Sequence, residues 1–289
     1  MRASEQASNG TGKRARVDAG GPGTTADALV RWCLAGGAEL KGIGLAAGKD
    51  EGRGFVAQRA VHAEECVLKL PHALVLSTSV ALDSAVGRCI AQQPTLRVLS
   101  ESSIEEERKK WEESEERGGH DESDGTEDDD GRQVVTARSV LYAYLIHQRS
   151  VELGDIGFTA YARALPESYS TPFTWPSAEL ARHADLRAEV ESLETHLRGQ
   201  YEVLFPLLSA GDSAALFPKA FFTWEAWLWA HASYQTRCFP RYRAMPAGGA
   251  AAAEREEDGV LLPLIDMLNH DHSGCNVRKQ PTSHHSMVP

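Results

Sequence analysis

The sequence predicts an α+β fold on three observations. Two short β-rich runs occupy residues 54–71, apolar residues recur at helical spacing through residues 133–240, and a strongly apolar segment follows at 260–269. The chain has 289 residues, of which 42% are hydrophobic. It can therefore bury a substantial core, in one large domain or two small ones.

The chain should begin with a disordered tail. Residues 1–26 are rich in Gly, Ser, Thr and Ala, and they show neither apolar periodicity nor the apolar run of a secretory signal. The basic stretch "KRAR" at 13–16 fits a solvated patch on this tail, with a nuclear address or part of a transit peptide as alternatives.

An N-terminal structured portion is expected over residues 27–100. Leu29, Trp32 and Cys33 share one face of a helix that should stop at Gly36 and Gly37. The runs "GFVAQRAV" (54–61) and "CVLKLP" (66–71) follow, separated by the polar "HAEE". They predict a hairpin or tight strand pair.

Residues 101–131 are expected to form a disordered acidic insertion. They hold fifteen Asp and Glu against four Lys and Arg, which accounts for the whole formal net charge of −11. An acidic arm that binds a basic partner is the alternative. The remainder of the chain is formally neutral, so net charge implies no nucleic-acid-binding surface.

Residues 132–240 should be mostly helical. Val190, Leu193 and Leu197 follow a three-and-four spacing, and Thr223 is a plausible N-cap for a helix with an aromatic stripe. A low-complexity loop follows this region. The apolar "VLLPLIDMLN" (260–269) is then a buried strand or a short helix, and its periodicity does not distinguish them.

The compartment is expected to be intracellular, cytoplasmic or nuclear, with a plastid not excluded. The five cysteines are dispersed without any C-x-x-C spacing, which fits reduced thiols better than a disulfide framework. No apolar run approaches the ~18 residues of a membrane helix, so no membrane partner is expected.

The short stretch "NHDHSGC" (269–275) invites a metal-site interpretation. His270, Asp271, His272 and Cys275 are possible ligands, but they lack the paired spacing of a structural zinc site, and we expect no metal. The sequence contains no G-x-S-x-G motif, so it does not favour a serine nucleophile. The glycines of "DEGRG" (50–54) precede a strand instead of opening a helix, so they indicate a close backbone approach to protein or ligand.

The order of four segments resembles the SET protein methyltransferases of the Rubisco-methyltransferase-like branch. The segments are "LVRWCLAGGAELKGIGLAAGKDEGRGFVAQRAVHAEECVLKLPHALVLS" (29–77), "FTAYARALPESYSTPFTW" (158–175), "TRCF" (236–239) and "PLIDMLNHDHSGCNV" (263–277). The resemblance covers residues 28–277 apart from the acidic insertion. It implies SET-domain β-strands with a large, mostly helical insert at 132–240, and a SET core with an Asn-His motif at 241–277.

The resemblance also implies a cofactor, S-adenosylmethionine, and a protein substrate, in a protein expected to be monomeric. The residues that match the family's cofactor-binding positions are Glu51, Gly52, Arg53, Arg237, Asp266, Met267, Leu268, Asn269 and His270. Singly, Arg237 also fits a surface ion pair, Asp266 a helix cap and Asn269 a turn. Asn269 carries donors and acceptors suited to the polar ends of the cofactor.

Phe239 and Ile265 bear on the acceptor side chain. The actin-histidine branch of the family has asparagine and tryptophan at these two positions. Because apolar residues replace them here, we expect lysine methylation of a non-histone protein. A protein-histidine methyltransferase and a non-catalytic protein-binding SET fragment are the alternatives.

The family's later segment, which carries a tyrosine aimed at the methyl group, has no counterpart here. No tyrosine follows Tyr242, so no catalytic residue is assigned. The C-terminal SET segment is therefore expected to be missing, the chain truncated, and residues 278–289 an unstructured tail.

Overall fold

The computed structural model describes residues 25–47, 53–100, 132–151, 157–239, 259–269, 278–281 and 285–288, together with the single positions 103, 104, 106 and 109. The α-helices are α1 (Thr25–Ala35), α2 (Thr78–Asp83), α3 (Ala85–Ala91), α5 (Ala137–Ser150), α6 (Thr159–Ala164), α7 (Ser177–Leu180), α8 (Ala184–Leu208) and α9 (Trp224–Arg237). Short 3₁₀ turns are η1 (His72–Leu74), η2 (Pro172–Thr174), η3 (Gly211–Ala215) and η4 (Ile265–Met267).

The strands are short and form four small sheets. They are β1 (Glu39–Leu40), β2 (Ile43–Ala47), β3 (Arg53–Ala57), β4 (Leu68–Leu70), β5 (Leu96–Leu99), β6 (Gln133–Thr136), β7 (Cys238–Phe239), β8 (Val260–Leu261), β9 (Arg278–Pro281) and β10 (His285–Val288). One sheet has four antiparallel strands in the order β1-β4-β10-β9, and the other pairs are β2-β3, β5-β6 and β7-β8. The prediction of an α+β fold is confirmed.

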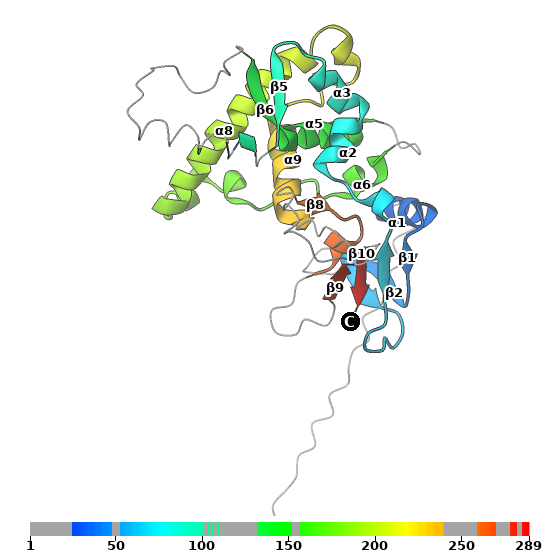
Figure 1. The fold of residues 1–289 in the computed structure, drawn as a ribbon. Coiled ribbons are helices and arrows are strands. Elements are labelled where there is room, and N and C mark those ends of the chain that lie inside the picture. Colours follow the sequence, from blue (N-terminus) through cyan, green and yellow to red (C-terminus); the bar gives the residue numbers. More distant parts are fainter. Residues whose placement is uncertain are drawn as a thin grey trace, which may run out of the picture.

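The helices and the four-stranded sheet occupy different ends of the molecule, with α1 between them (Figure 1). Helix α5 lies at the centre of the helical part, and ten of its fourteen side chains are buried because it packs against α2, α3, α6 and α9. The long α8 buries only four positions along one stripe, as expected of a surface helix.

Helix α1 follows its prediction closely. Leu29 and Cys33 are buried, and the helix ends in a Schellman arrangement in which Gly37 adopts a φ of 89°. The amide of Ala38 donates to Cys33 O at 2.9 Å, and that of Gly37 donates to Leu34 O at 3.0 Å. Glycine is required there because that φ is costly for any residue with a Cβ atom.

The predicted hairpin between residues 54–61 and 66–71 is wrong. Strand β3 pairs antiparallel with β2, in a register that places Gly54 opposite Ala46. Strand β4 pairs with β1 on one edge and β10 on the other. The run 43–47 is rich in Gly and Ala, so it lacks the β-branched signature that would have identified it as the partner of β3.

The prediction of an unstructured tail over 278–289 is also wrong. Residues 278–281 and 285–288 are strands, and β10 pairs with both β4 and β9. The pairing satisfies backbone groups of β4 that an open sheet edge would leave without partners. The predicted end of the N-terminal tail at residue 26 is also wrong, because α1 begins at Thr25. Residues 1–24 lie outside the described residues.

The acidic insertion lies mostly outside the described residues. Its positions 103, 104, 106 and 109 are helical, so the expectation of no regular structure is wrong there. The Ser100 hydroxyl accepts from the amide of Ser103 at 3.1 Å, which is the hydrogen bond of a helix N-cap. This local cap starts a helical turn even where the composition is unfavourable.

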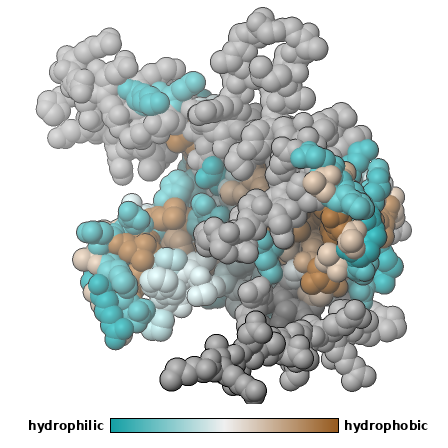
Figure 2. Space-filling view, turned by 90° about the horizontal axis from the view of Figure 1, so that it is seen from below, coloured by the Kyte–Doolittle hydropathy of each residue, from teal (hydrophilic) through white to brown (hydrophobic). Residues whose placement is uncertain are grey.

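Large apolar side chains on the described surface are few and separate. Leu34 on α1, Val56 on β3 and Phe221 before α9 are 46%, 41% and 52% exposed. Hydrophobic residues show in separate areas of the face drawn in Figure 2, with hydrophilic ones beside them. Scattered apolar exposure of this kind is ordinary. Among the described residues, no helix is long and apolar enough to span a bilayer.

Candidate active site

The segment 259–269 is both a strand and a short helix, the two alternatives that its apolar pattern left open. Strand β8 pairs antiparallel with β7, which places Leu261 opposite Cys238. The turn η4 follows at Ile265–Met267, preceded by Leu264 with a φ of 69°. Because β7 directly continues α9, this pairing brings η4 beside the C-terminal end of α9.

Arg237 and Asp266 form an ion pair at this junction. Arg237, the last residue of α9, donates from Nη1 to the main-chain oxygen of Asp266 at 3.0 Å and to its Oδ2 at 3.3 Å. The Asp266 side chain is completely buried, and that of Arg237 is 20% exposed. One guanidinium therefore clamps both the backbone and the carboxylate of η4 to the end of α9.

Tyr161 completes this cluster from α6. Its hydroxyl group donates to Asp266 Oδ2 at 2.8 Å, and its side chain is fully buried. Burial raises the pKa of the Asp266 carboxyl group, whereas Arg237 and Tyr161 oppose that rise. Burial and then the neighbouring carboxylate raise the pKa of Tyr161 well above its usual value, so its hydroxyl group remains a donor.

Polar atoms of the cluster have unused hydrogen-bonding capacity. Among the described residues, Asp266 Oδ1 and Arg237 Nε are buried without a hydrogen-bond partner. The Tyr169 hydroxyl lies near Ser233 and Arg237, and burial raises its pKa. Buried groups of this kind are normally satisfied by protein, water or ligand. A polar ligand or ordered water fits their chemistry.

Gly54 of β3 meets Asn269, which follows η4 in the chain. A Cβ atom at Gly54 would lie 2.7 Å from Asn269 Nδ2, so the amide of Asn269 packs directly on the β3 backbone. Asn269 itself is exposed, which leaves its amide open to a ligand. The close approach expected for the glycines of residues 50–54 therefore occurs at Gly54.

The structure brings together part of the predicted site. Arg237 ends α9, Asp266 lies in η4, and Asn269 is the second residue after η4. Arg53 lies in β3 beside Gly54. Met267 is buried and Leu268 is half-buried. Glu51, Gly52 and His270, together with the side chain of Arg53, lie outside the described residues.

The two predicted substrate-pocket residues differ in exposure. Phe239 is half-buried in β7, opposite Val260. Ile265 is only 1% exposed and belongs to the hydrophobic core. Ile265 can therefore affect a pocket only indirectly, by supporting the residues that line it.

Sequence reasoning expected a close backbone approach at the glycines of residues 50–54, but it did not single out Tyr161 or Tyr169 as site residues. Both tyrosines lie in the segment 158–175 that resembled the family, and that segment was the available signal. Nothing in their local spacing indicated Asp266, which is 105 residues from Tyr161 in the chain. Their role depends on tertiary contacts.

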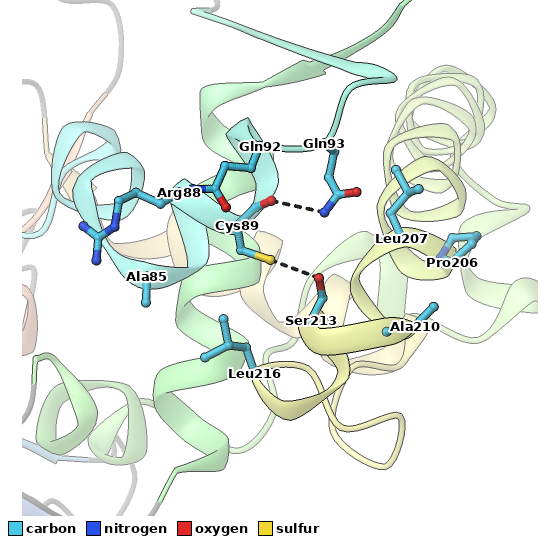
Figure 3. A pocket seen from close by; sticks show the side chains of 11 residues that line it. Ala85, Arg88, Cys89, Gln92, Gln93, Pro206, Leu207, Ala210, Ser213 and Leu216 are labelled. Atoms are coloured by element: carbon cyan, nitrogen blue, oxygen red, sulfur yellow. Dashed lines mark hydrogen bonds between the residues drawn. The ribbon is translucent and has the colours of Figure 1, made fainter.

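Two other features lie apart from this cluster. A hollow of about 770 Å³ opens between α3 and the end of α8, where the Cys89 thiol and the Ser213 hydroxyl are 3.1 Å apart (Figure 3). It contains none of the predicted site residues. Among the described residues, no three His, Cys, Asp or Glu side chains could jointly hold a metal ion. His270, Asp271, His272 and Cys275 are outside that part of the chain.

The sequence is similar to that of a group of protein methyltransferases. It is 23% identical over 250 residues to the actin-histidine N-methyltransferase of Gallus gallus, and 24% identical to those of Mus musculus and Homo sapiens. The alignments cover 84% of this chain and 33% of each relative, so the chain spans about a third of their length. No family model matches the chain.

The fold agrees with that of solved SET-domain structures. The SET domain of LSMT bound to lysine and AdoHcy superposes with a TM-score of 0.57 at 16% identity, over 91% of this chain and 50% of that one. Rubisco LSMT bound to AdoMet gives a TM-score of 0.56 at 15% identity, over 92% and 49%. The resemblance that the motifs predicted is thus confirmed: the chain has a SET-like fold and is similar in sequence to these protein methyltransferases.

Proposed function

We propose that this chain forms the cofactor-binding part of an S-adenosylmethionine-dependent protein N-methyltransferase. One observation carries the proposal: Arg237 and Asp266 pair beside η4, and Asn269 packs on Gly54, within a SET-type fold. Solved relatives of the same fold hold AdoMet or AdoHcy. The curated relatives methylate a protein side chain.

The described residues fit such a cofactor. S-adenosylmethionine presents a sulfonium cation, an amino-acid group and an adenine, so its pocket needs acceptors, a cation and close backbone approach. Asp266 Oδ1 and Arg237 Nε supply unused acceptor and donor capacity. Gly54 lets the Asn269 amide pack against the β3 backbone, and this exposed amide can bond polar ends of the ligand.

The chain's own contribution to the reaction would be binding and alignment. When bound, S-adenosylmethionine supplies an electrophilic methyl group. Asn269 and Arg237 would fix the ligand's polar ends, and the buried clamp on Asp266 would hold both in register. Alignment of this kind is worth several kcal/mol in a displacement reaction. An attacking lysine nitrogen must arrive deprotonated, which desolvation favours.

We infer lysine as the acceptor, with histidine as the alternative. Support comes from Phe239 and Ile265, because neither offers the polar group that would orient an imidazole ring. Two of the solved relatives hold lysine or methyllysine with AdoHcy, whereas the curated relatives act on a histidine of actin. Amino-acid analysis of proteins labelled by the full-length protein in a cell extract distinguishes the two. Methylhistidine as the sole product would overturn the lysine inference.

Calorimetric titration of the chain with S-adenosylmethionine tests the proposed function directly. We expect saturable binding that Asn269→Ala weakens at least tenfold. Gln235→Ala is a matched control, since Gln235 is an exposed amide side chain on α9. Absence of binding by a folded wild-type chain, or equal affinity in the Asn269→Ala variant, would contradict the proposal.

A further inference from the structure

The buried cluster at η4 joins three separate elements through one carboxylate. Tyr161 comes from α6, Arg237 from α9 and Asp266 from η4, and both of the others donate to Asp266 Oδ2. We propose that Tyr161 is a positioning residue of the cofactor site, which acts through Asp266 to hold η4 and Arg237 in place. This inference rests on the proposed function.

The hydroxyl group of Tyr161 has one role in the structure. Its side chain is fully buried, and its hydroxyl donates to Asp266 at 2.8 Å. A buried hydroxyl group without a partner is unfavourable, and a phenylalanine would fill the same space. The hydroxyl therefore contributes through Asp266.

Four titratable groups among the described side chains interact with Asp266. They are Cys33 on α1, Tyr161 on α6, Tyr169 in the segment after α6, and Arg237 on α9. Strand β3 also packs against η4, but the side chain of Arg53 lies outside the described residues. Burial, and then Asp266, raises the pKa of Cys33 to about 12, so its thiol stays neutral. Among these groups, only Arg237 is a cation, and only Arg237 and Tyr161 donate hydrogen bonds to the Asp266 carboxylate.

Loss of the Tyr161 hydroxyl has a defined electrostatic consequence. Burial already raises the pKa of Asp266, and Tyr161 is one of the two side chains that lower it. Without the hydroxyl, the carboxyl group would take up a proton at higher pH. A protonated Asp266 attracts Arg237 less strongly, which would loosen the clamp on η4.

The clamp matters because the backbone at the start of η4 is strained. Leu264 adopts a φ of 69°, a conformation that branched aliphatic residues avoid. Such a conformation persists only where the surrounding contacts impose it. Asp266, two residues further on, accepts three hydrogen bonds from neighbouring side chains, one from Tyr161 and two from Arg237. Asn269 follows three residues later and packs on Gly54. A displacement of η4 would therefore reach the ligand-facing amide.

Four proteins test this role: wild type, Tyr161→Phe, Asp266→Asn and the double variant. Tyr142→Phe is the matched control, because Tyr142 is also buried and its hydroxyl bonds His231, a residue of α9 away from η4. The affinity for S-adenosylhomocysteine is measured by calorimetry between pH 5.5 and 8, and the free energy of unfolding by urea titration over the same range.

We expect Tyr161→Phe to weaken S-adenosylhomocysteine binding about tenfold at pH 7, as for one lost hydrogen bond to a charged group. Tyr142→Phe should bind as wild type does. The folded Tyr161→Phe variant binds a proton at higher pH than the wild type. Its loss of stability should therefore be largest at neutral pH and shrink as the pH falls. In the Asp266→Asn background this pH dependence should vanish.

Four results would count against the positioning role or the proposed function. Equal affinity of wild type and Tyr161→Phe would overturn the positioning role and leave the proposed function intact. The same pH dependence in the Asp266→Asn background would also overturn it. Absence of binding by the folded wild type would overturn the proposed function and, with it, this role. If Tyr161→Phe does not fold, Asp266→Asn alone decides, and wild-type affinity in that variant would refute the proposal.

Discussion

The contact between Gly54 and Asn269 makes a steric prediction about ligand binding. In a Gly54→Ala variant, the new methyl group would lie 2.7 Å from Asn269 Nδ2. Ordinary contact begins near 3.4 Å, so the amide must move by about 0.7 Å. Because the clashing atom is the end of an exposed, flexible side chain, the fold should accept the methyl group and the amide should move.

The expected effects on stability and on affinity therefore differ. Replacing glycine by alanine reduces the conformational entropy of the unfolded chain, which stabilises the folded protein by about 0.4–1 kcal/mol. The tight contact with Asn269 offsets part of this stabilisation. The free energy of unfolding should change by less than about 1 kcal/mol. Loss of one ligand hydrogen bond from Asn269 costs about 0.5–1.5 kcal/mol, or roughly a 2- to 12-fold weaker affinity for S-adenosylmethionine.

Gly44→Ala provides the matched control. Its methyl group would lie 2.2 Å from Gln58 Nε2, the end of another flexible amide, on the neighbouring strand β2. Calorimetry on the three proteins should show weaker binding only for Gly54→Ala. Equal affinity of Gly54→Ala and wild type would refute the placement of Asn269 in the site. Equal weakening by Gly44→Ala would trace the effect to the β2-β3 ribbon as a whole.

Three further predictions concern stability. Thr223→Ala removes the N-cap of α9 and should cost about 1 kcal/mol in urea unfolding, whereas Thr236→Ala, at an exposed position near its end, should cost less. Gly37→Ala should destabilise by roughly 1 kcal/mol because its φ is 89°, whereas Gly199→Ala, in open space on α8, should stabilise by about 0.5–1 kcal/mol. Burial lowers the pKa of His231 to about 4, so stability should fall as the pH drops from 6.5 towards 4, and a His231→Gln variant should lose that dependence.

The sequence predicted elements whose signals are local. Helix α1 combines an apolar stripe with a glycine stop, and α9 combines a Thr223 cap with an aromatic stripe, so a window of a dozen residues contains both signals. Strand pairing is different, because the partner of a strand can lie anywhere in the chain. Strand β3 pairs with the preceding β2, whereas β4 pairs with β10, which lies more than 200 residues later in the chain. Neither choice is encoded in the run itself.

The same distinction applies to the candidate site. The order of motifs predicted that Arg237, Asp266 and Asn269 would act together, and the structure pairs the first two directly. It could not predict that Asn269 rests on Gly54, nor that Tyr161 donates to Asp266, since both contacts depend on how distant elements pack. A buried tyrosine in an apolar stretch is indistinguishable from a core residue until its partner is known.

The pair of Arg237 and Asp266 is poorly explained as a source of stability. Asp266 is fully buried, and removing a carboxylate from water costs several kcal/mol, which its partners only partly recover. An apolar pair of the same size would hold α9 against η4 at least as well. An apolar pair, however, would impose no particular orientation on the guanidinium and would bind no main-chain oxygen. Directional bonds to Asp266 from α6 and α9 fix the orientation of a strained turn, as the proposed cofactor site would require.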